Sequence, residues 1–507
     1  MSAQELFFLA ALATPFAIGT LLIALGRRLP APSMTMAFLA GAGFLLPGAH
    51  AVTACAWFAQ SIDPATGYAW VTTLPFGIEP IGISLTLALN GISLPLYTLA
   101  ALVGAAAGIH ALGSDVENKP AYLGLLLLML GGMLAMFATM DVFFLYFFHE
   151  FTLIPAFILI LRWGGLGRRT AAIQMVIYLT LGAMISLAGI ILLVLKSGAG
   201  NFNLLALSHA IAASPIDATS ANWIFGLLLF GFGILVSLFP FHSWAPPTYT
   251  EAPTPVSMLH AGVLKNFGLY GLIQLGALLV PAGLTAWADV LFWLAIGNTL
   301  AIGIVTLGQQ HLKEMLSYSS VAHMGTCFLG IFAFSLSRDS ATALGATVIV
   351  MFAHGLSTAA LFSLSHSVQR RTGTLEFDEN GGLIKRAPVL AAFFATAAMA
   401  SIGLPGFAGF WGEMGVFVSL WKLPLWKLLL ALCGLLISAT YMLRAFAIIF
   451  LGKESENIAH QNTLSPIRDI TWNERISTGI LLAALLATGL LPRLITDNLN
   501  TALGGTP

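Results

Sequence analysis

The chain has 507 residues, of which 58% are hydrophobic and 8% are charged, and its formal net charge at pH 7 is zero. An ordinary soluble domain carries about 25% charged residues, so the composition excludes a soluble domain. The balanced charge does not suggest a nucleic-acid partner. Apolar runs of about 20 residues recur along the chain, and each is long enough as a helix to cross a hydrocarbon layer of about 30 Å. A membrane β-barrel would show alternating segments of about 10 residues instead. We therefore predict an all-α polytopic membrane protein.

Hydropathy and helix-breaking residues predict about 14 transmembrane helices. The first run stays as a span, because it lacks a basic n-region and is followed by Arg27 and Arg28, the reverse of a secretory signal. Between the second and third spans, residues 69–87 combine turn residues with short β-branched stretches, which predicts a β-hairpin outside the bilayer. The predicted spans are 5–25, 33–57, 90–112, 121–140, 142–162, 171–196, 222–245, 254–281, 285–308, 312–336, 341–367, 388–420, 424–450 and 474–493.

Basic residues predict the orientation of these spans, because Lys and Arg are enriched in cytoplasmic loops. Loops after odd-numbered spans hold 14 of them, whereas loops and the tail after even-numbered spans hold five. We therefore predict a multi-pass protein of the cell inner (cytoplasmic) membrane with both termini in the periplasm. The larger set is Arg27, Arg28, Lys119, Arg162, Arg168, Arg169, Lys313, Arg370, Arg371, Lys385, Arg386, Lys453, Arg468 and Arg475, and the smaller set is Lys196, Arg338, Lys422, Lys427 and Arg493.

Two predicted spans are broken by proline and glycine, the seventh at residues 239–247 and the twelfth at residues 403–410. The breaks lie about 165 residues apart, as do the starts of the fourth and ninth spans, which is the offset of two inverted five-helix repeats. Paired broken helices indicate an ion site near the midplane, although each proline could simply kink a packed helix. The predicted domains are 1–120 (helices 1–3 with a periplasmic hairpin), 121–281 (first repeat, broken helix 7), 285–450 (second repeat, broken helix 12) and 451–507 (C-terminal helix 14).

Ionisable residues inside the predicted spans mark the candidate proton path. A charge at that depth costs at least a few kcal/mol unless it pairs, faces water or takes up a proton. Glu150 lies inside the fifth span and Glu413 follows the break of the twelfth. For both, a buried carboxyl that is hydrogen-bonded to neutral partners is the less favoured alternative. Lys265 in the eighth span is a candidate too, unless it lies near an interface and snorkels.

Histidines and a second lysine supply further candidates for proton transfer. An isolated membrane histidine is as easily a satisfied structural residue as a relay group, and Lys313 would make a good proton exit if it is buried. Asp141 is predicted to cap the fifth helix and Glu251 to mark the start of the eighth. The histidine candidates are His242 at the first break, His149 beside Glu150, and His323 and His354 near Ser319, Ser320 and Ser357.

Several motifs together resemble the antiporter-like membrane subunits of respiratory NADH:quinone oxidoreductase, or complex I. The resemblance covers nearly the whole chain. A glutamate rather than a lysine at Glu413, and the absence of a long C-terminal lateral helix, imply the M-type chain, chain 4. The motifs are PFHSW at 240–244, EAPTPVS at 251–257, LSYSSVAHMG at 316–325, HGL at 354–356 and GLPGFAGFWGE at 403–413.

This resemblance implies a subunit of a proton-translocating enzyme, with the L-type and N-type antiporter-like chains as partners and the lipid bilayer around it. Glu150 matches the family's fifth-span glutamate, Glu413 its terminal proton-site acid, and His323 and His354 its central-axis histidines. Quinone reduction in other subunits would then drive protons from cytoplasm to periplasm. The sequence has no Rossmann glycine fingerprint and no cysteine cluster, so we expect no cofactor and no redox centre in this chain.

Three departures from the family pattern bear on function. The lysine that the family places five residues before the proline of the seventh-span motif is Leu235 here, so the expected partner of Glu150 is missing. Lys265 stands one residue earlier than the family's eighth-span lysine, a rotation of about 100° on a helix, and Asn90 replaces a common aspartate. Two hypotheses stay open. Either Lys265, aided by His260, has partly taken over the lost cation's role, or Glu150 stays protonated and coupling is weaker or altered.

Other functions share part of this pattern. A stand-alone multi-subunit cation/proton antiporter has the same fold and the same broken helices. A non-conducting structural subunit of the membrane arm would tolerate Leu235 in place of the lysine. A solute carrier would require an apolar or anion-binding pocket, for which the sequence shows no dedicated motif.

Overall fold

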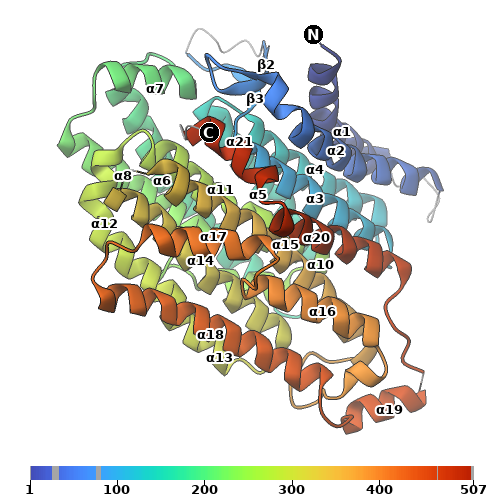
Figure 1. Cartoon of the computed structure of the whole chain (residues 1–507). Helices are drawn as coiled ribbons and strands as arrows, with labels where there is room; N and C mark the ends of the chain where they lie inside the picture. The colour runs from blue at the N-terminus through green and yellow to red at the C-terminus, as the bar shows by residue number, and fades with distance from the viewer. Residues whose placement is uncertain (1, 26–33, 76–81, 338, 465, 504–507) are drawn as a thin grey trace.

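The structure, a computed structural model, is an almost wholly helical bundle and describes residues 2–25, 34–75, 82–337, 339–464 and 466–503. Helices lie side by side through the whole molecule (Figure 1). This architecture follows from the solvent, because a helix satisfies its own backbone hydrogen bonds where no water is present to do so. The basic residues Arg27, Arg28 and Arg338, which enter the orientation count above, lie outside the described residues.

Within the described residues, 11 helices are long and apolar enough to cross a membrane. The number becomes 12 if α20 (Trp472–Leu490) and α21 (Arg493–Leu503), which meet at 69°, form one span. The chain is therefore a multi-pass membrane protein. The 11 helices are α1 (Ala3–Leu25), α2 (Met34–Ser61), α3 (Ser93–Leu112), α4 (Lys119–Ala138), α5 (Val142–Trp163), α6 (Arg168–Ser197), α8 (Ala218–Val236), α12 (Pro281–Ile296) continued through η5 (Gly297–Ile302) and α13 (Gly303–Gly308), α14 (Leu312–Ser337), α15 (Ser340–Thr372) and α18 (Leu425–Phe450).

The count is lower than the 14 predicted because two of the predicted spans are interrupted and the last one, α20, is counted only together with α21. The stretch predicted as 254–281 is divided by π-helical turns into α10 (Thr254–Leu259), η3 (His260–Leu264), α11 (Asn266–Gly271) and η4 (Leu272–Ala277). The stretch predicted as 388–420 is divided into α16 (Pro388–Ser401) and α17 (Ala408–Ser419) by a turn in which Gly403 and Gly406 have positive φ, a conformation that glycine adopts without strain. In the same way α8 ends before a proline-containing turn, and the chain resumes as α9 (Ala245–Glu251).

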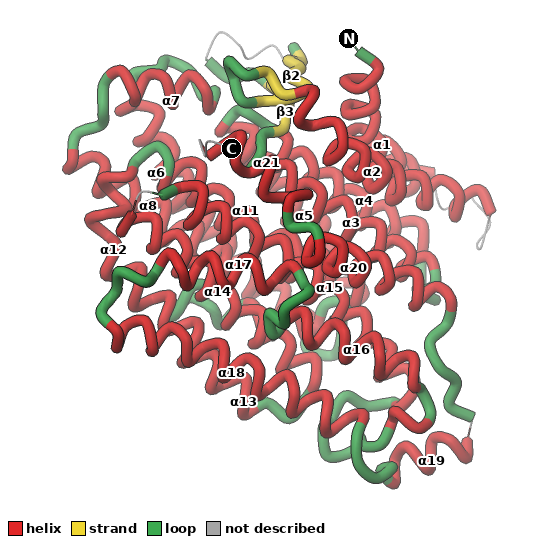
Figure 2. Tube along the Cα trace, in the orientation of Figure 1, coloured by secondary structure: helices red, strands yellow, loops and turns green. Residues whose placement is uncertain are grey.

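The predicted hairpin forms beside the N-terminal helices (Figure 2), although its connection, residues 76–81, lies outside the described residues. A three-stranded antiparallel sheet has the order β1 (Ile62–Asp63), β2 (Tyr68–Leu74), β3 (Leu85–Leu89). Asp141 joins this sheet to α5, because its carboxylate accepts hydrogen bonds from the backbone N–H groups of Phe143 at 2.9 Å and Ser84 at 3.0 Å. The prediction that Asp141 caps the fifth helix is therefore confirmed.

Shorter elements complete the described chain. They are α7 (Leu204–Ala213), η6 (Leu383–Lys385) and α19 (Glu456–Leu464).

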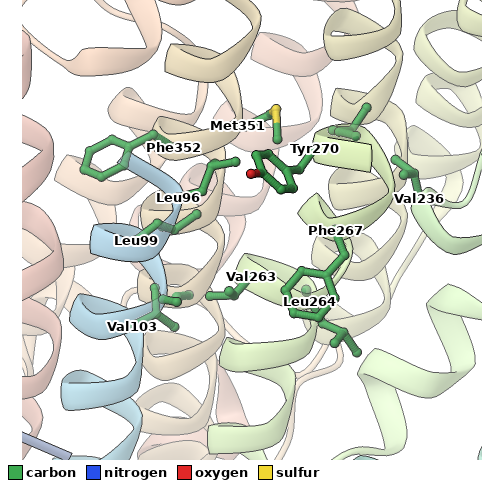
Figure 3. Packing of buried hydrophobic residues seen from close by; sticks show 14 of the residues in the cluster. Leu96, Leu99, Val103, Val236, Val263, Leu264, Phe267, Tyr270, Met351 and Phe352 are labelled. Carbon is green, nitrogen blue, oxygen red and sulfur yellow. The ribbon is translucent and has the colours of Figure 1, made fainter. Parts of the chain in front are cut away.

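The centre of the bundle is α15, whose most apolar 18 residues are all buried, and the corresponding stretches of α3 and α14 are nearly so. Side chains of α3 such as Leu99 and Val103 point toward Val263 of η3 (Figure 3). Gly262 of η3 and Gly355 of α15 bring these two segments into backbone contact, since a Cβ on Gly262 would lie 2.8 Å from the Gly355 carbonyl oxygen. This close approach places the residues that neighbour the two glycines, in the middle of the bundle, within reach of one another.

Candidate functional site

Lys265 lies at the junction of η3 and α11 and is only 2% exposed, so it does not snorkel to an interface. Its Nζ donates to the carbonyl oxygen of Ser320 on α14 at 2.8 Å and also contacts the Ser320 hydroxyl. Among the described residues it forms no ion pair with a carboxylate, and the only aromatic face beneath it is that of Tyr249, at 5.8 Å. A buried amine that is held by neutral dipoles is suited to gain and lose a proton.

His354 and His323 continue from Ser320. Nε2 of His354 lies 3.1 Å from the Ser320 hydroxyl and 3.2 Å from the hydroxyl of Thr358. The imidazole rings of His354 and His323 lie 5.3 Å apart, centroid to centroid. The Ser357 hydroxyl donates to the backbone carbonyl of His354 and does not reach the ring. The structure thus brings Lys265, His354 and His323 into one connected row, as the sequence motifs suggested.

On its far side His323 contacts α18 and the end of α16. Its Nδ1 lies 3.3 Å from the Tyr441 hydroxyl, which in turn lies 3.0 Å from the Ser319 hydroxyl. Its Nε2 lies 3.1 Å from the carbonyl oxygen of Ser401. A cavity of ≈ 10 Å³, close to the size that one water needs, adjoins His323 and Tyr441 and is also lined by Ser438. Sequence reasoning missed Tyr441, because a single tyrosine in an apolar run belongs to no motif.

Glu413 lies one helical turn into α17, beside the turn that begins after Ser401. A Cβ on Gly403 would collide with Oε2 of Glu413, so the carboxylate is packed directly against this glycine. Glu413 is half-buried, and no hydrogen bond or ion pair joins its carboxylate to another described residue. The row that begins at Lys265 therefore ends near Glu413, whose two carboxylate oxygens can bind solvent or a proton.

The fifth-helix end of the row differs from expectation. Glu150, with its side chain 30% exposed, pairs with the adjacent His149 at 3.1 Å and has no contact with Lys265. His149 lines a cavity of ≈ 10 Å³ together with Leu235, His260 and Lys265. Leu235 thus faces the same small cavity as Lys265. Among the described residues, the group that can pair with Glu150 as a cation is His149.

His260 also borders this cavity, and both of its ring nitrogens lack a hydrogen-bond partner among the described residues. Its ring packs edge-on against Trp244 and Tyr249, with centroids 5.7 Å and 5.3 Å away. A buried imidazole without partners normally costs free energy. Because the His260 ring borders the cavity, a proton donor or acceptor inside the cavity can reach its nitrogens.

Two predicted residues, His242 and Lys313, lie apart from the row. His242 stacks on Phe239 at the seventh-span break, with centroids 5.9 Å apart. Lys313 is half-buried at the first turn of α14, where its Nζ donates to the Ala252 carbonyl at 2.7 Å. Glu251 ends α9 and accepts a hydrogen bond from the backbone N–H of Gly167 at 2.9 Å. Its contact is structural, as predicted, but it is made with the start of α6 and not with the start of the predicted eighth helix.

The whole arrangement is a line of groups that can bind or release protons. It runs from Glu150 and His149, across the small cavity, to Lys265, and then through Ser320 and the two central histidines to the surroundings of Glu413. The Ser320 hydroxyl bridges Lys265 and His354, and a hydroxyl can donate and accept at once. Such a line can pass protons in steps, because a change of charge on one member alters the protonation of the next.

Comparisons with known proteins agree with this geometry. The family described as NADH:quinone oxidoreductase/Mrp antiporter, TM, matches residues 139–438. NAD(P)H-quinone oxidoreductase chain 4 1 of Picosynechococcus sp. is 34% identical over 428 residues, which cover 83% of this chain and 77% of the relative. NAD(P)H-quinone oxidoreductase chain 4 of Gloeobacter violaceus is 31% identical over 443 residues, which cover 86% and 80%.

Solved structures share the fold over nearly the whole chain. A chain of respiratory complex I from Thermus thermophilus with bound NADH superposes with a TM-score of 0.84 at 28% identity, covering 98% of both chains. A chain of the Mrp complex from Dietzia sp. superposes with a TM-score of 0.83 at 20% identity, covering 99% of this chain and 97% of the other. The second likeness concerns the fold alone.

Proposed function

Because the chain belongs to the NADH:quinone oxidoreductase/Mrp antiporter family, we propose that it conducts protons itself, along the row from Glu150 to Glu413. Its homologues are chain 4 subunits of complex I, and its partners are other membrane-arm subunits. One observation supports conduction above the rest. The buried amine of Lys265 donates to Ser320, whose hydroxyl lies 3.1 Å from Nε2 of His354. The ring of His323 lies 5.3 Å beyond, centroid to centroid, so groups that can carry a proton follow one another between the two halves of the chain.

The energy source lies outside this chain. Quinone reduction in other subunits rearranges charge along the membrane arm, and Lys265, His354 and His323 respond by passing a proton toward Glu413. The proposed steps need no cofactor within the chain, because they use only groups that exchange protons.

The proposal includes 14 spans arranged as two inverted repeats, 121–281 and 285–450, between N-terminal helices in 1–120 and a C-terminal helix in 451–507. Two observations support it. The interrupted segments 254–281 and 388–420 are rich in apolar residues, and together with the bent pair α20 and α21 they would bring the 11 continuous spans to 14. The chain is broken after both α8 and α16, by a proline-rich stretch at 239–247 and by a glycine-rich stretch with one proline at 403–410. Basic loops then place both termini in the periplasm.

The missing lysine at Leu235 leaves two forms of this proposal at the fifth helix. In one, a change of charge on Lys265 or His260 alters the protonation of His149 across the shared cavity. His149 then alters the protonation of Glu150, with which it pairs. In the other, Glu150 stays protonated and only the part from Lys265 to Glu413 conducts. A non-conducting structural subunit is the competing function that Leu235 favours.

Glu413→Gln is expected to lower the number of protons pumped per quinone reduced, because glutamine fills the same space beside Gly403 but cannot release a proton. The measurement uses the complex purified from its native membrane and reconstituted in liposomes, with the co-purifying chains identified. Glu314→Gln is the matched control, because Glu314 is exposed in the first turn of α14.

Unchanged pumping by the Glu413→Gln complex would contradict conduction through this chain. Co-purification with small antiporter subunits alone, without quinone-oxidoreductase chains, would instead indicate the stand-alone exchanger.

A further inference from the structure

A third, much larger cavity lies at the end of the bundle where the basic loops gather. Its volume is ≈ 950 Å³, which is room for on the order of 30 waters at ~30 Å³ each. Several segments that are distant in sequence line it, and most contribute a titratable or charged side chain. The lining includes His110 from α3, Glu251 from α9, Lys313 from α14, His366 and Arg370 from α15, and Glu474 from α20.

Two histidines face each other at the wall of this cavity. The rings of His110 and His366 lie 5.0 Å apart with planes at 63°, although α3 and α15 are far apart in sequence. His110 is buried and its Nδ1 lies 3.5 Å from the Ser363 hydroxyl, while His366 is half-buried. A neutral imidazole can accept a proton at one ring nitrogen and release one from the other, so this pair can relay a proton from water in the cavity.

A polar face of α14 leads inward from the same cavity. Lys313, Ser317 and Ser320 follow one another at spacings of four and three residues, so they share one side of the helix. The Ser317 hydroxyl donates to the Lys313 carbonyl at 2.7 Å and lies 3.2 Å from the Thr250 hydroxyl. Ser320, the last of the three, holds Lys265. Polar groups on one face of a single helix thus lie between the cavity and the central row.

We propose that this cavity is the vestibule from which protons reach Lys265, with His110 and His366 as the uptake pair and Lys313 as the next acceptor. The inference rests on the proposed function and adds its uptake site. In each transfer one O–H or N–H bond breaks as an N–H bond forms on the acceptor, and no electron moves.

The vestibule changes the expected role of Lys313. The loops that line the cavity follow odd-numbered spans, which carry most of the basic residues. Lys313 therefore belongs to proton uptake from the cytoplasmic side, whereas its place in the sequence suggested an exit. The lining also argues against an anion as the occupant, because Asp115, Glu251 and Glu474 contribute negative charge beside the cations.

The double variant His110→Gln, His366→Gln tests the proposal in the purified complex reconstituted in liposomes. Proton pumping is expected to slow by roughly tenfold or more, the scale on which a positioned proton-transfer group acts. The control is His209→Gln, because His209 is exposed on α7, outside the cavity lining.

A second measurement applies even if the double variant does not assemble. Asn473→Cys places a thiol in the vestibule lining of an assembled complex, where an impermeant, bulky thiol reagent is expected to block uptake. The parent complex treated with the same reagent controls for its own exposed Cys433.

The outcomes separate the vestibule from the proposed function. Wild-type pumping by the histidine variant or after labelling of Cys at 473, together with lost pumping in Glu413→Gln, would overturn the vestibule and leave conduction intact. Wild-type pumping in all of them would overturn both. Wild-type pumping with loss of a bound anionic lipid from the histidine variant would overturn uptake and indicate a headgroup site.

Discussion

Lys265→Met is expected to stop proton pumping through this chain while the complex still assembles. Methionine is close to lysine in length and shape, so the buried space stays filled, but the Nζ that joins Ser320 to the small cavity near His149 is lost. Removing a positioned proton-transfer group costs roughly 10²–10⁴ in rate. Folding should not suffer, because replacing a buried charge by an apolar side chain is often neutral or stabilising.

The measurement is the rate of proton pumping by the reconstituted complex, with its thermal inactivation midpoint as the check on folding. Lys427→Met is the matched control. Lys427 lies on the outer side of the bundle, where it contacts Asp289 at 3.4 Å and lies over aromatic rings. Wild-type pumping by the Lys265→Met complex would show that Lys265 is not part of the proton path.

Gly403→Val is expected to reduce pumping as strongly as Glu413→Gln, although it leaves every titratable group in place. Gly403 has φ of +78°, and a Cβ there would collide with the Glu413 carboxylate and push it from its position. The branched side chain also costs about 1–3 kcal/mol in this backbone conformation. We therefore expect both lower pumping and a lower thermal inactivation midpoint.

Gly406→Val separates the two effects of that substitution. Gly406 lies in the same turn with φ of +104°, but a Cβ there meets nothing within 4 Å. It should lower thermal stability and leave pumping nearly unchanged. If Gly403→Val and Gly406→Val lose pumping equally, the loss comes from distortion of the broken helix and not from displacement of the Glu413 carboxylate.

Much of the fold and of the central row could be predicted because the evidence is local in the sequence. Apolar runs predict membrane helices directly, and the placement of Ser320 and His323 three residues apart on α14 predicts that both lie along one helix. The motif glycine Gly355 follows His354 and lets α15 approach η3. The hairpin and the Asp141 cap were also predictable, since turn residues and caps act within a few residues.

The remainder depends on contacts between distant segments. Tyr441 reaches His323 from α18, and His110 meets His366 across the bundle, but neither pair has a sequence spacing that would reveal it. The pairing of Glu150 with His149 instead of Lys265 depends on where η3 directs the lysine side chain. The π-helical turns that interrupt residues 254–281 likewise depend on packing, because no proline between residues 256 and 280 marks where they occur.

The account predicts that Lys265 and Glu413 act in series on one proton path. The most direct test measures pumping by reconstituted complexes that carry Lys265→Met, Glu413→Gln or both substitutions. When two groups act as one unit, the losses caused by their separate substitutions do not add. The double variant should therefore pump at the rate of whichever single variant pumps more slowly. Losses that multiply in the double variant would contradict a single path, as would wild-type pumping in either single variant.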